Sequence, residues 1–134
     1  QTLLLVKDVM LKGNKLPLIS HKSNILKAIQ VISKKNLGLG IVIKNKFAIG
    51  IVTDGDIRRG AKKFSVKNKI TMLMTKKPLY TSEDTPASKA LSIMSEKKIT
   101  SLLVSSYRNY KKNKAYFKPI GILHIHSLLK YGIK

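Results

Sequence analysis

The sequence predicts an α/β protein made of two copies of one β-α-β-β-α unit. GIVTDGDI at Gly50–Ile57 is matched near the C-terminus by GILHIHSL at Gly121–Leu128, 121 − 50 = 71 residues later. Upstream, LKAIQVISKKNLGLGIVI matches SKALSIMSEKKITSLLVS at an offset of 90 − 28 = 62, so the second copy carries 71 − 62 = 9 extra residues, in a loop within Tyr107–Lys118. Two copies of this length favour paired subdomains over a solenoid array.

In the first copy, a short strand at Leu18 and Ile19 precedes a helix that Ser23 can cap. Apolar residues of this helix recur at helical spacing, at Ile25, Ala28, Ile29 and Ile32. The β-branched runs 39–43 and 48–52 flank a polar turn, which is typical of a β-hairpin. A short helix that Asp54 or Asp56 can open completes the unit.

The second copy repeats this plan, with Thr85 as the helix cap and Pro86 at the first helical position. Its strands are expected at 101–104 and 119–123, and its last helix near Ser127. We place the domains at 1–66 and 67–134. Each copy is preceded by a similar apolar lead-in, namely Val6, Val9 and Met10, then Ile70, Leu73 and Met74. Because each half alone has a thin core, each lead-in is expected to pack on the other copy.

Composition limits the classes of function. The 134 residues leave no room for a catalytic domain beside the duplication, and without cysteine neither disulfides nor thiolate metal sites can form. The absence of cysteine fits a cytoplasmic protein. No apolar run is long enough to span a bilayer and nothing resembles a signal peptide, so we expect no membrane association. The chain begins at Gln1 rather than methionine, which suggests part of a longer protein.

The net charge of +21 invites a nucleic-acid interpretation, since 27 basic residues face 6 acidic ones. However, only Arg58, Arg59 and Arg108 are arginines, and the remaining 27 − 3 = 24 lysines lack the planar fork used for bidentate base contacts. The lysines are also spread along the whole chain. Solvated lysine faces are therefore the preferred explanation, and nucleic acid is an unlikely partner.

The segment Thr53-Asp54-Gly55-Asp56 is the strongest candidate site. It follows a strand and opens a helix, where free backbone N–H groups favour an anion such as phosphate. Thr53 can add a hydroxyl to a phosphate oxygen, and the Asp56 carboxylate can accept hydrogen bonds from a sugar diol. Gly55 allows positive φ or a close approach to a ligand. The alternative is that these are ordinary turn and N-cap residues.

His124 and His126 lie at the equivalent place in the second copy and could offer two metal nitrogens. No third ligand is apparent, so no metal is predicted. The alternative is that one histidine bonds to a turn while the other lines a cleft. Around these two and His21 we find no pair of nucleophile and base, and we predict no catalytic residues.

The plan of each copy, closed in the first by GIVTDGD, resembles the cystathionine-β-synthase (CBS) domain, and the tandem resembles a Bateman module. Five strings, DVM, KNLG, GIVTDGDIRRG, ITSLLV and GILHIHSLLKYGI, are similar to the C-terminal half of D-arabinose 5-phosphate isomerases across essentially the whole chain. The resemblance implies two CBS-type β-α-β-β-α subdomains in a pseudo-twofold pair. The sugar isomerase domain of that family is absent here, so this chain should have no turnover.

The resemblance also suggests site residues. Thr53 and Asp56 fall on the family's phosphate and ribose positions, whereas His124 and Ser127 replace them in the second copy. Similar isomerases often keep an aspartate where Ser127 stands, so the first cleft is favoured. We expect that cleft to be formed by Ile19, Gly40, Thr53, Asp54, Gly55, Asp56 and Arg58. A weaker second cleft would use Tyr80, Ser101, His124, His126 and Ser127.

By this resemblance the chain would be the ligand-sensing and oligomer-supporting part of an isomerase that interconverts D-ribulose 5-phosphate and D-arabinose 5-phosphate for lipopolysaccharide sugar synthesis. Its effector would be a nucleotide or nucleotide-sugar, and no cofactor is implied. It would form a homodimer, and a higher homo-oligomer in the full-length isomerase. Two alternatives remain: a CBS pair that binds nothing and only joins protomers, and a basic nucleic-acid-binding domain.

Overall fold

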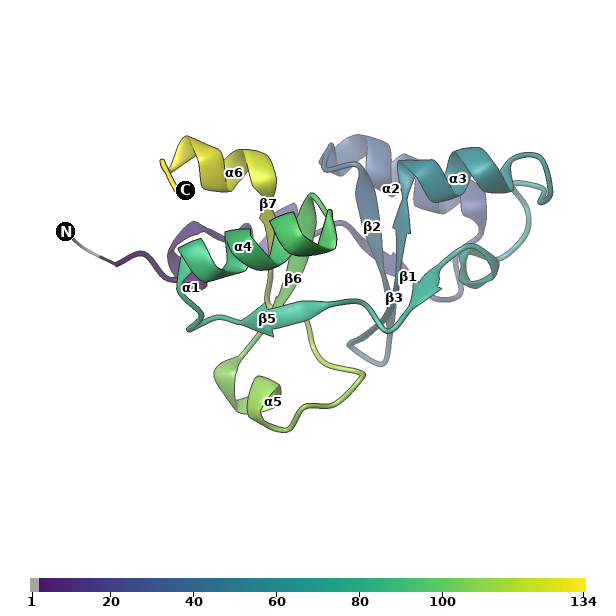
Figure 1. Ribbon diagram of the computed structural model, residues 1–134. Helices are drawn as coiled ribbons and strands as arrows, with labels where there is room; N and C mark the ends of the chain where they lie inside the picture. The colour runs from purple at the N-terminus through teal and green to yellow at the C-terminus, as the bar shows by residue number, and fades with distance from the viewer. Residues whose placement is uncertain (1–2) are drawn as a thin grey trace. The chain divides into compact units, whose positions relative to one another are not determined.

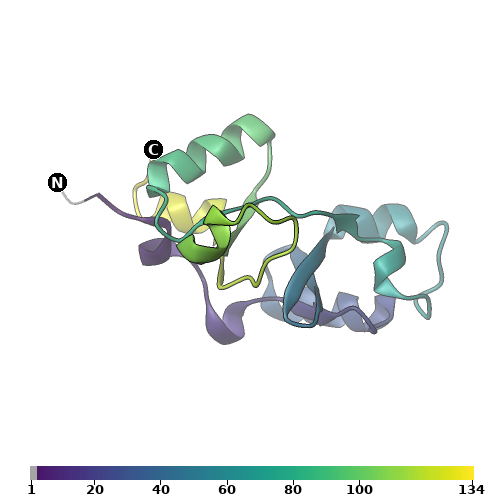
Figure 2. The same ribbon diagram turned by 90° about the horizontal axis from the view of Figure 1, so that it is seen from below.

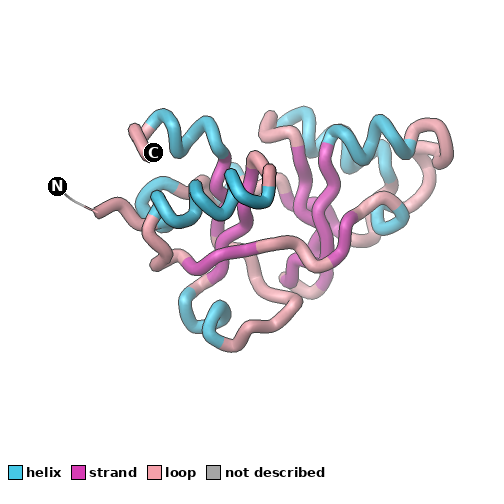
Figure 3. Tube along the Cα trace, in the orientation of Figure 1, coloured by secondary structure: helices cyan, strands magenta, loops and turns pink. Residues whose placement is uncertain are grey.

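The computed structural model describes residues 3–134, which fold into two compact α/β units (Figure 1). One unit is Asn14–Pro78, and the other joins the chain up to Gly13 to Leu79–Lys134. Each unit has its own small sheet, flanked by helices (Figure 3). The predicted α/β class is therefore confirmed. None of the helices in this described part of the chain has the length and apolar character to cross a bilayer.

The unit Asn14–Pro78 contains the first copy. After a 3-10 turn at Gly13–Lys15, its elements are β1 (Leu18–Ser20), α2 (Ile25–Lys35), β2 (Leu39–Lys44), β3 (Phe47–Thr53), α3 (Asp54–Gly60), a 3-10 turn (Ile70–Met72) and β4 (Thr75–Lys76). Its sheet has the order β1-β2-β3-β4, in which β1 is parallel to β2 and the other pairs are antiparallel. The predicted strand, helix and hairpin are all present.

Helix α2 covers the core of this unit because its buried side chains, Ile25, Ala28 and Ile32, share one face. It is capped by Asn24, whose Oδ1 accepts a hydrogen bond from Lys27 N at 2.9 Å, one residue later than the predicted cap Ser23. At its other end Asn36 adopts the left-handed conformation, with φ 58°, and donates its N–H to Ile32 O.

The second unit repeats this topology. Its elements are α1 (Val6–Val9), β5 (Tyr80–Ser82), α4 (Ala87–Lys97), β6 (Ser101–Ser105), α5 (Tyr107–Lys111), β7 (Gly121–His124) and α6 (Ile125–Lys130). Strand β6 pairs in parallel with β5 and antiparallel with β7. Ser101 pairs with His124 in the second sheet just as Leu39 pairs with Thr53 in the first. Ser101 follows Leu39 by 101 − 39 = 62 residues and His124 follows Thr53 by 124 − 53 = 71, which are the two offsets found in the sequence. The register thus confirms the duplication.

The lead-in segments are exchanged between the copies, as predicted. Val6 and Val9 are buried in one core with Ala90, Met94 and Leu123 of the second copy. In the other unit Ile70 is buried in the core of the first copy. The correspondence extends to Gly121 and Gly50, where an added methyl group would overlap Met10 and Met74 respectively. Each glycine therefore lets a lead-in methionine lie directly on the sheet.

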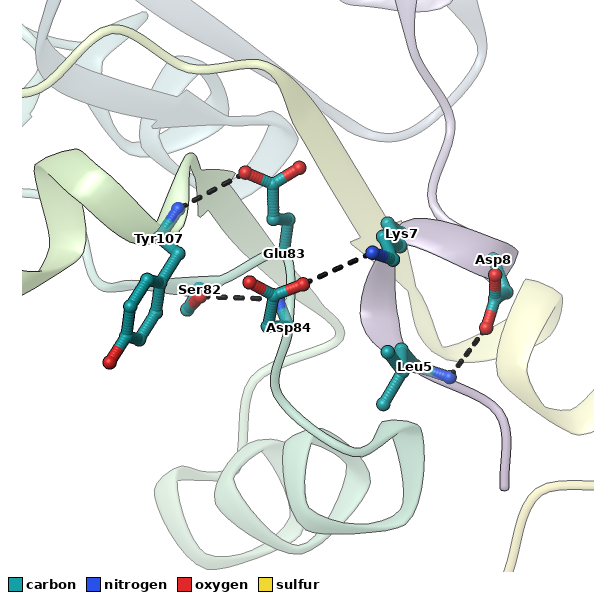
Figure 4. A network of polar contacts seen from close by, with 7 residues as sticks. All are labelled: Leu5, Lys7, Asp8, Ser82, Glu83, Asp84 and Tyr107. Atoms are coloured by element: carbon teal, nitrogen blue, oxygen red, sulfur yellow. Dashed lines mark hydrogen bonds and ion pairs between the residues drawn. The ribbon is translucent and has the colours of Figure 1, made fainter. Parts of the chain in front are cut away.

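Polar contacts fix the first lead-in to the second copy (Figure 4). Val6 N donates to Thr85 O at 2.8 Å, and Lys7 N donates to Glu83 O at 2.9 Å. The Lys7 ammonium lies 3.2 Å from Asp84, and Tyr107 N donates to the Glu83 carboxylate at 3.1 Å. Thr85 is bonded through its hydroxyl to Thr81, and Pro86 rather than Thr85 occupies the N-cap position of α4. The predicted capping role of Thr85 is therefore wrong.

Candidate functional site

Thr53 and Asp56 meet where β3 ends and α3 begins, and they form a capping box. Thr53 Oγ1 accepts a hydrogen bond from Asp56 N at 3.1 Å, and Asp56 Oδ2 accepts one from Thr53 N at 2.9 Å. This reciprocal pair satisfies two backbone donors that a helix start leaves free. The hydroxyl and the carboxylate are thereby held next to each other in fixed positions.

The second carboxylate oxygen of Asp56 contacts Arg59. Arg59 Nη2 lies 2.7 Å from Asp56 Oδ1, and the arginine side chain is 73% exposed against 17% for the aspartate. The guanidinium folds back over Gly55, where an added Cβ would lie 3.1 Å from Nη1. Gly55 belongs to α3 and is not among the residues with positive φ, so the positive φ considered for it is wrong. The missing side chain instead gives Arg59 room.

The other residues predicted for the first cleft are placed differently. Ile19 is 1% exposed in the core, and Gly40 is buried where a methyl group would overlap Ile19 and Ile32. Asp54 borders a cavity of about 330 Å³. Arg58 is exposed on α3. The structure thus brings Thr53, Gly55 and Asp56 together with Arg59, which the sequence did not single out as a site residue.

In the second copy, His124 takes the place of Thr53 as a helix cap. Its Nδ1 accepts a hydrogen bond from His126 N at 3.2 Å, and the two rings meet edge to face with centroids 4.8 Å apart. Within residues 3–134 no group of three or more histidine or carboxylate side chains could hold a metal ion. The turn-bonded alternative for one histidine is therefore confirmed for His124.

The surroundings of His124 predict that the second copy loses stability in acid. Burial and, to a lesser degree, the nearby His126 lower the pKa of His124 below its ordinary value. A lowered pKa means that the unfolded chain binds the proton more readily, so stability is full above the unfolded pKa of about 6.5 and is lost as pH falls. We expect the melting temperature to drop between pH 7 and 5, and to drop less in His124→Asn, which keeps a capping side chain. Equal drops in both proteins would contradict this role of His124.

The remaining second-copy candidates differ from their first-copy counterparts. Ser127 stands where Asp56 stands, and a serine has no carboxylate to accept two bonds as Asp56 does. The Ser101 hydroxyl is a buried side-chain oxygen without a hydrogen-bond partner, the one such atom among the described residues. The site geometry of the first copy is therefore not repeated in the second.

Tyr80, at the start of β5, forms an aromatic cluster with Tyr110 and Phe117 of the inserted segment of the second copy. Its ring stacks on Phe117, with centroids 3.9 Å apart, and its hydroxyl donates to Lys114 O at 2.7 Å. Burial, followed by the neighbouring Tyr110, raises the pKa of Tyr80 above its ordinary value. Helix α5 and the loop after it, the light green segment in Figure 2, are thereby attached to β5. The insertion is thus partly helical rather than only a loop.

Comparison with known proteins agrees with this fold. Residues 6–63 and 66–134 each match the family model for the CBS domain. The chain is 36% identical to the arabinose 5-phosphate isomerase KdsD of Francisella tularensis, an alignment that covers 98% of this chain and 38% of that protein. The chain thus spans well under half the length of this curated relative.

Two solved structures show the same arrangement of elements. The CBS domain pair of protein MJ0100, in complex with 5′-methylthioadenosine and S-adenosyl-L-methionine, has a TM-score of 0.78 at 22% identity, covering 98% of this chain and 97% of that one. The CBS domain protein PAE2072 from Pyrobaculum aerophilum, complexed with AMP, has a TM-score of 0.76 at 17% identity, covering 93% and 90%.

Proposed function

Because this chain belongs to the CBS domain family and carries two copies of the domain, we propose that it is a regulatory module that binds a nucleotide or nucleotide-sugar through its first copy. Support comes from similar domain pairs, which bind AMP in one case and S-adenosyl-L-methionine with 5′-methylthioadenosine in another. All three ligands carry a ribose diol. The proposal therefore requires a site for that diol.

The observation that carries the proposal is the capping box of the first copy. It presents a partly buried carboxylate, Asp56, beside the Thr53 hydroxyl. Each carboxylate oxygen has two lone pairs, so Asp56 can keep its bond to Thr53 N and still accept bonds from two ribose hydroxyls. The second copy offers His124 and Ser127 at these positions, and neither supplies a carboxylate.

We further propose that the module serves an aldose-ketose isomerase acting on D-arabinose 5-phosphate in lipopolysaccharide sugar synthesis, as its similarity to the KdsD protein suggests. In this proposal the chain itself has no turnover, supports a homodimer, and works in the cytoplasm. Ligand binding would change the activity of the isomerase domain of the same polypeptide.

The proposal predicts unequal effects of matched substitutions in the two copies. Asp56→Asn keeps an amide oxygen for the Thr53 N–H but removes the charge, so the affinity for AMP or for the bound nucleotide-sugar should fall by about 1.5 to 3 kcal/mol. Ser127→Ala should change affinity little. Isothermal titration calorimetry with AMP, S-adenosyl-L-methionine and UDP- and CMP-sugars measures both, after melting curves have shown that each variant folds.

Other outcomes separate the alternatives. Equal losses at Asp56 and Ser127 would move the occupied site away from the first copy. Absence of binding by every nucleotide, together with an intact homodimer, would leave a structural module without ligand. Binding that falls steeply with salt, and that Asp56→Asn leaves unchanged, would favour the nucleic-acid alternative.

A further inference from the structure

The face of β1 that points away from the core is open to solvent. Leu18 and Ser20 are exposed on this face, whereas Ile19 between them is buried in the core. Both border an open hollow of about 420 Å³ within the unit Asn14–Pro78, and Leu18 is 46% exposed there. The hollow is also lined by His21, Lys22, Ile43 and Asn45.

The second copy covers the corresponding face with its inserted segment, residues 107–118. Tyr80 holds the position of Leu18, 80 − 18 = 62 residues later, and β5 pairs with β6 in the register that β1 has with β2. Phe117 of the inserted segment stacks on Tyr80 with ring centroids 3.9 Å apart and is itself only 2% exposed. In the first copy a two-residue turn joins β2 to β3, so no such cover is available.

The charges at the two strand ends are opposite. The inserted segment of the second copy carries five basic residues and no acidic one. It meets an acidic strand end, where Tyr107 N donates to the Glu83 carboxylate at 3.1 Å. In the first copy His21 and Lys22 hold the positions of Glu83 and Asp84. The open face therefore offers donors where the covered face offers acceptors.

Further positive charge lies beside the hollow. Asn45 lines it, and both neighbours of this residue, Lys44 and Lys46, are exposed. The only acidic residues of the unit Asn14–Pro78, Asp54 and Asp56, follow the opposite end of β3. Charge complementarity therefore favours an acidic occupant, and it disfavours a second copy of this chain, whose net charge is +21.

We propose that the open face of β1 docks an acidic segment of another protein. An aromatic side chain of that segment lies on Leu18 and Ile43, as Phe117 lies on Tyr80, and its carboxylates meet Lys22 and the adjoining turn. Aromatic anchors carry much of the binding energy of protein interfaces, while complementary charges select the partner. This docking face lies at the other end of β3 from the nucleotide site proposed at Asp56, so the two proposals are independent.

The test uses three peptides based on residues 106–118. The first has the sequence of the chain, the second has glutamate in place of the five basic residues, and the third is the second with alanine in place of its aromatic residues. Each is titrated into the chain labelled at isoleucine and leucine ¹³C-methyl groups, in about 0.15 M salt to screen non-specific attraction. The second peptide should shift Leu18 and Ile43 saturably, with an affinity at least about tenfold higher than that of the third.

The same titrations contain the outcomes that would overturn the proposal. Equal affinities of the second and third peptides would mean that no aromatic anchor is seated on the face. Tighter binding of the first, basic peptide would mean that the face receives the inserted segment of a second copy of this chain. Shifts of the same methyl groups by oligothymidylate at an affinity equal to that of the second peptide would mark a site for any polyanion.

A matched pair of charge reversals locates the docking face. Lys22→Glu gives this position the sign that it has in the second copy, and it should weaken the second peptide about three- to tenfold. Lys62→Glu makes the same change of charge at an exposed site after α3 and should leave the affinity nearly unchanged. Equal losses in both variants would show attraction by net charge alone and would contradict the proposal. Because the peptides are compared on the unaltered chain, that comparison stands even if a variant folds poorly.

Discussion

Replacing Val6 and Val9 together by aspartate is expected to unfold the unit that contains the second copy while the unit Asn14–Pro78 stays folded. Both valines are buried, at 0% and 3% exposure, in the core formed with Ala90, Met94 and Leu123. Burying unpaired carboxylates there should cost more than about 4 kcal/mol. Hydrogen exchange read by mass spectrometry should show loss of protection in α4 and β6 and retained protection in α2 and β2.

The matched control is Leu3→Asp, which changes an apolar residue to aspartate three positions before Val6 at a site that is 65% exposed. This variant should keep protection in both units. If Val6 and Val9 can be replaced without loss of protection in α4, the lead-in does not stabilise the second copy. If instead α2 loses protection as fully as α4, the two units unfold as one and do not have independent stability.

The sequence predicted most of the fold because the two copies confirm each other. Helical periodicity located α2, and two β-branched runs around a polar turn located the β2–β3 hairpin. The matching apolar pattern of the two lead-in segments indicated their exchange between the copies. The cap positions were less certain. Asn24 caps α2 instead of Ser23, since adjacent residues that can both cap are separated only by backbone geometry.

The candidate site was harder to predict, because its details depend on tertiary contacts. Arg59 lies three residues after Asp56, a spacing at which side chains of a helix meet, so this one contact could have been predicted from the sequence, whereas Arg58 lies only two residues after Asp56. Packing places the Ile19 side chain in the core, although the family resemblance suggested that it forms the first cleft. The aromatic cluster of Tyr80 joins residues more than 30 positions apart. The concentration of aromatic residues in the nine-residue insertion was the one available signal.

Phe117→Ala is expected to detach the inserted segment from β5. Phe117 is 2% exposed and stacks on Tyr80, so its truncation should cost about 3 to 5 kcal/mol in chemical denaturation of this unit. Because burial raises the pKa of Tyr80, the variant should also bring that pKa back toward its ordinary value of about 10 in an alkaline absorbance titration. Tyr116→Ala, at a neighbouring aromatic that is 47% exposed, should change neither quantity appreciably. If Phe117→Ala lowers stability but leaves the pKa of Tyr80 raised, something other than the inserted segment keeps Tyr80 out of water. If Phe117→Ala changes neither the stability nor the pKa of Tyr80, the inserted segment does not pack on β5 in solution.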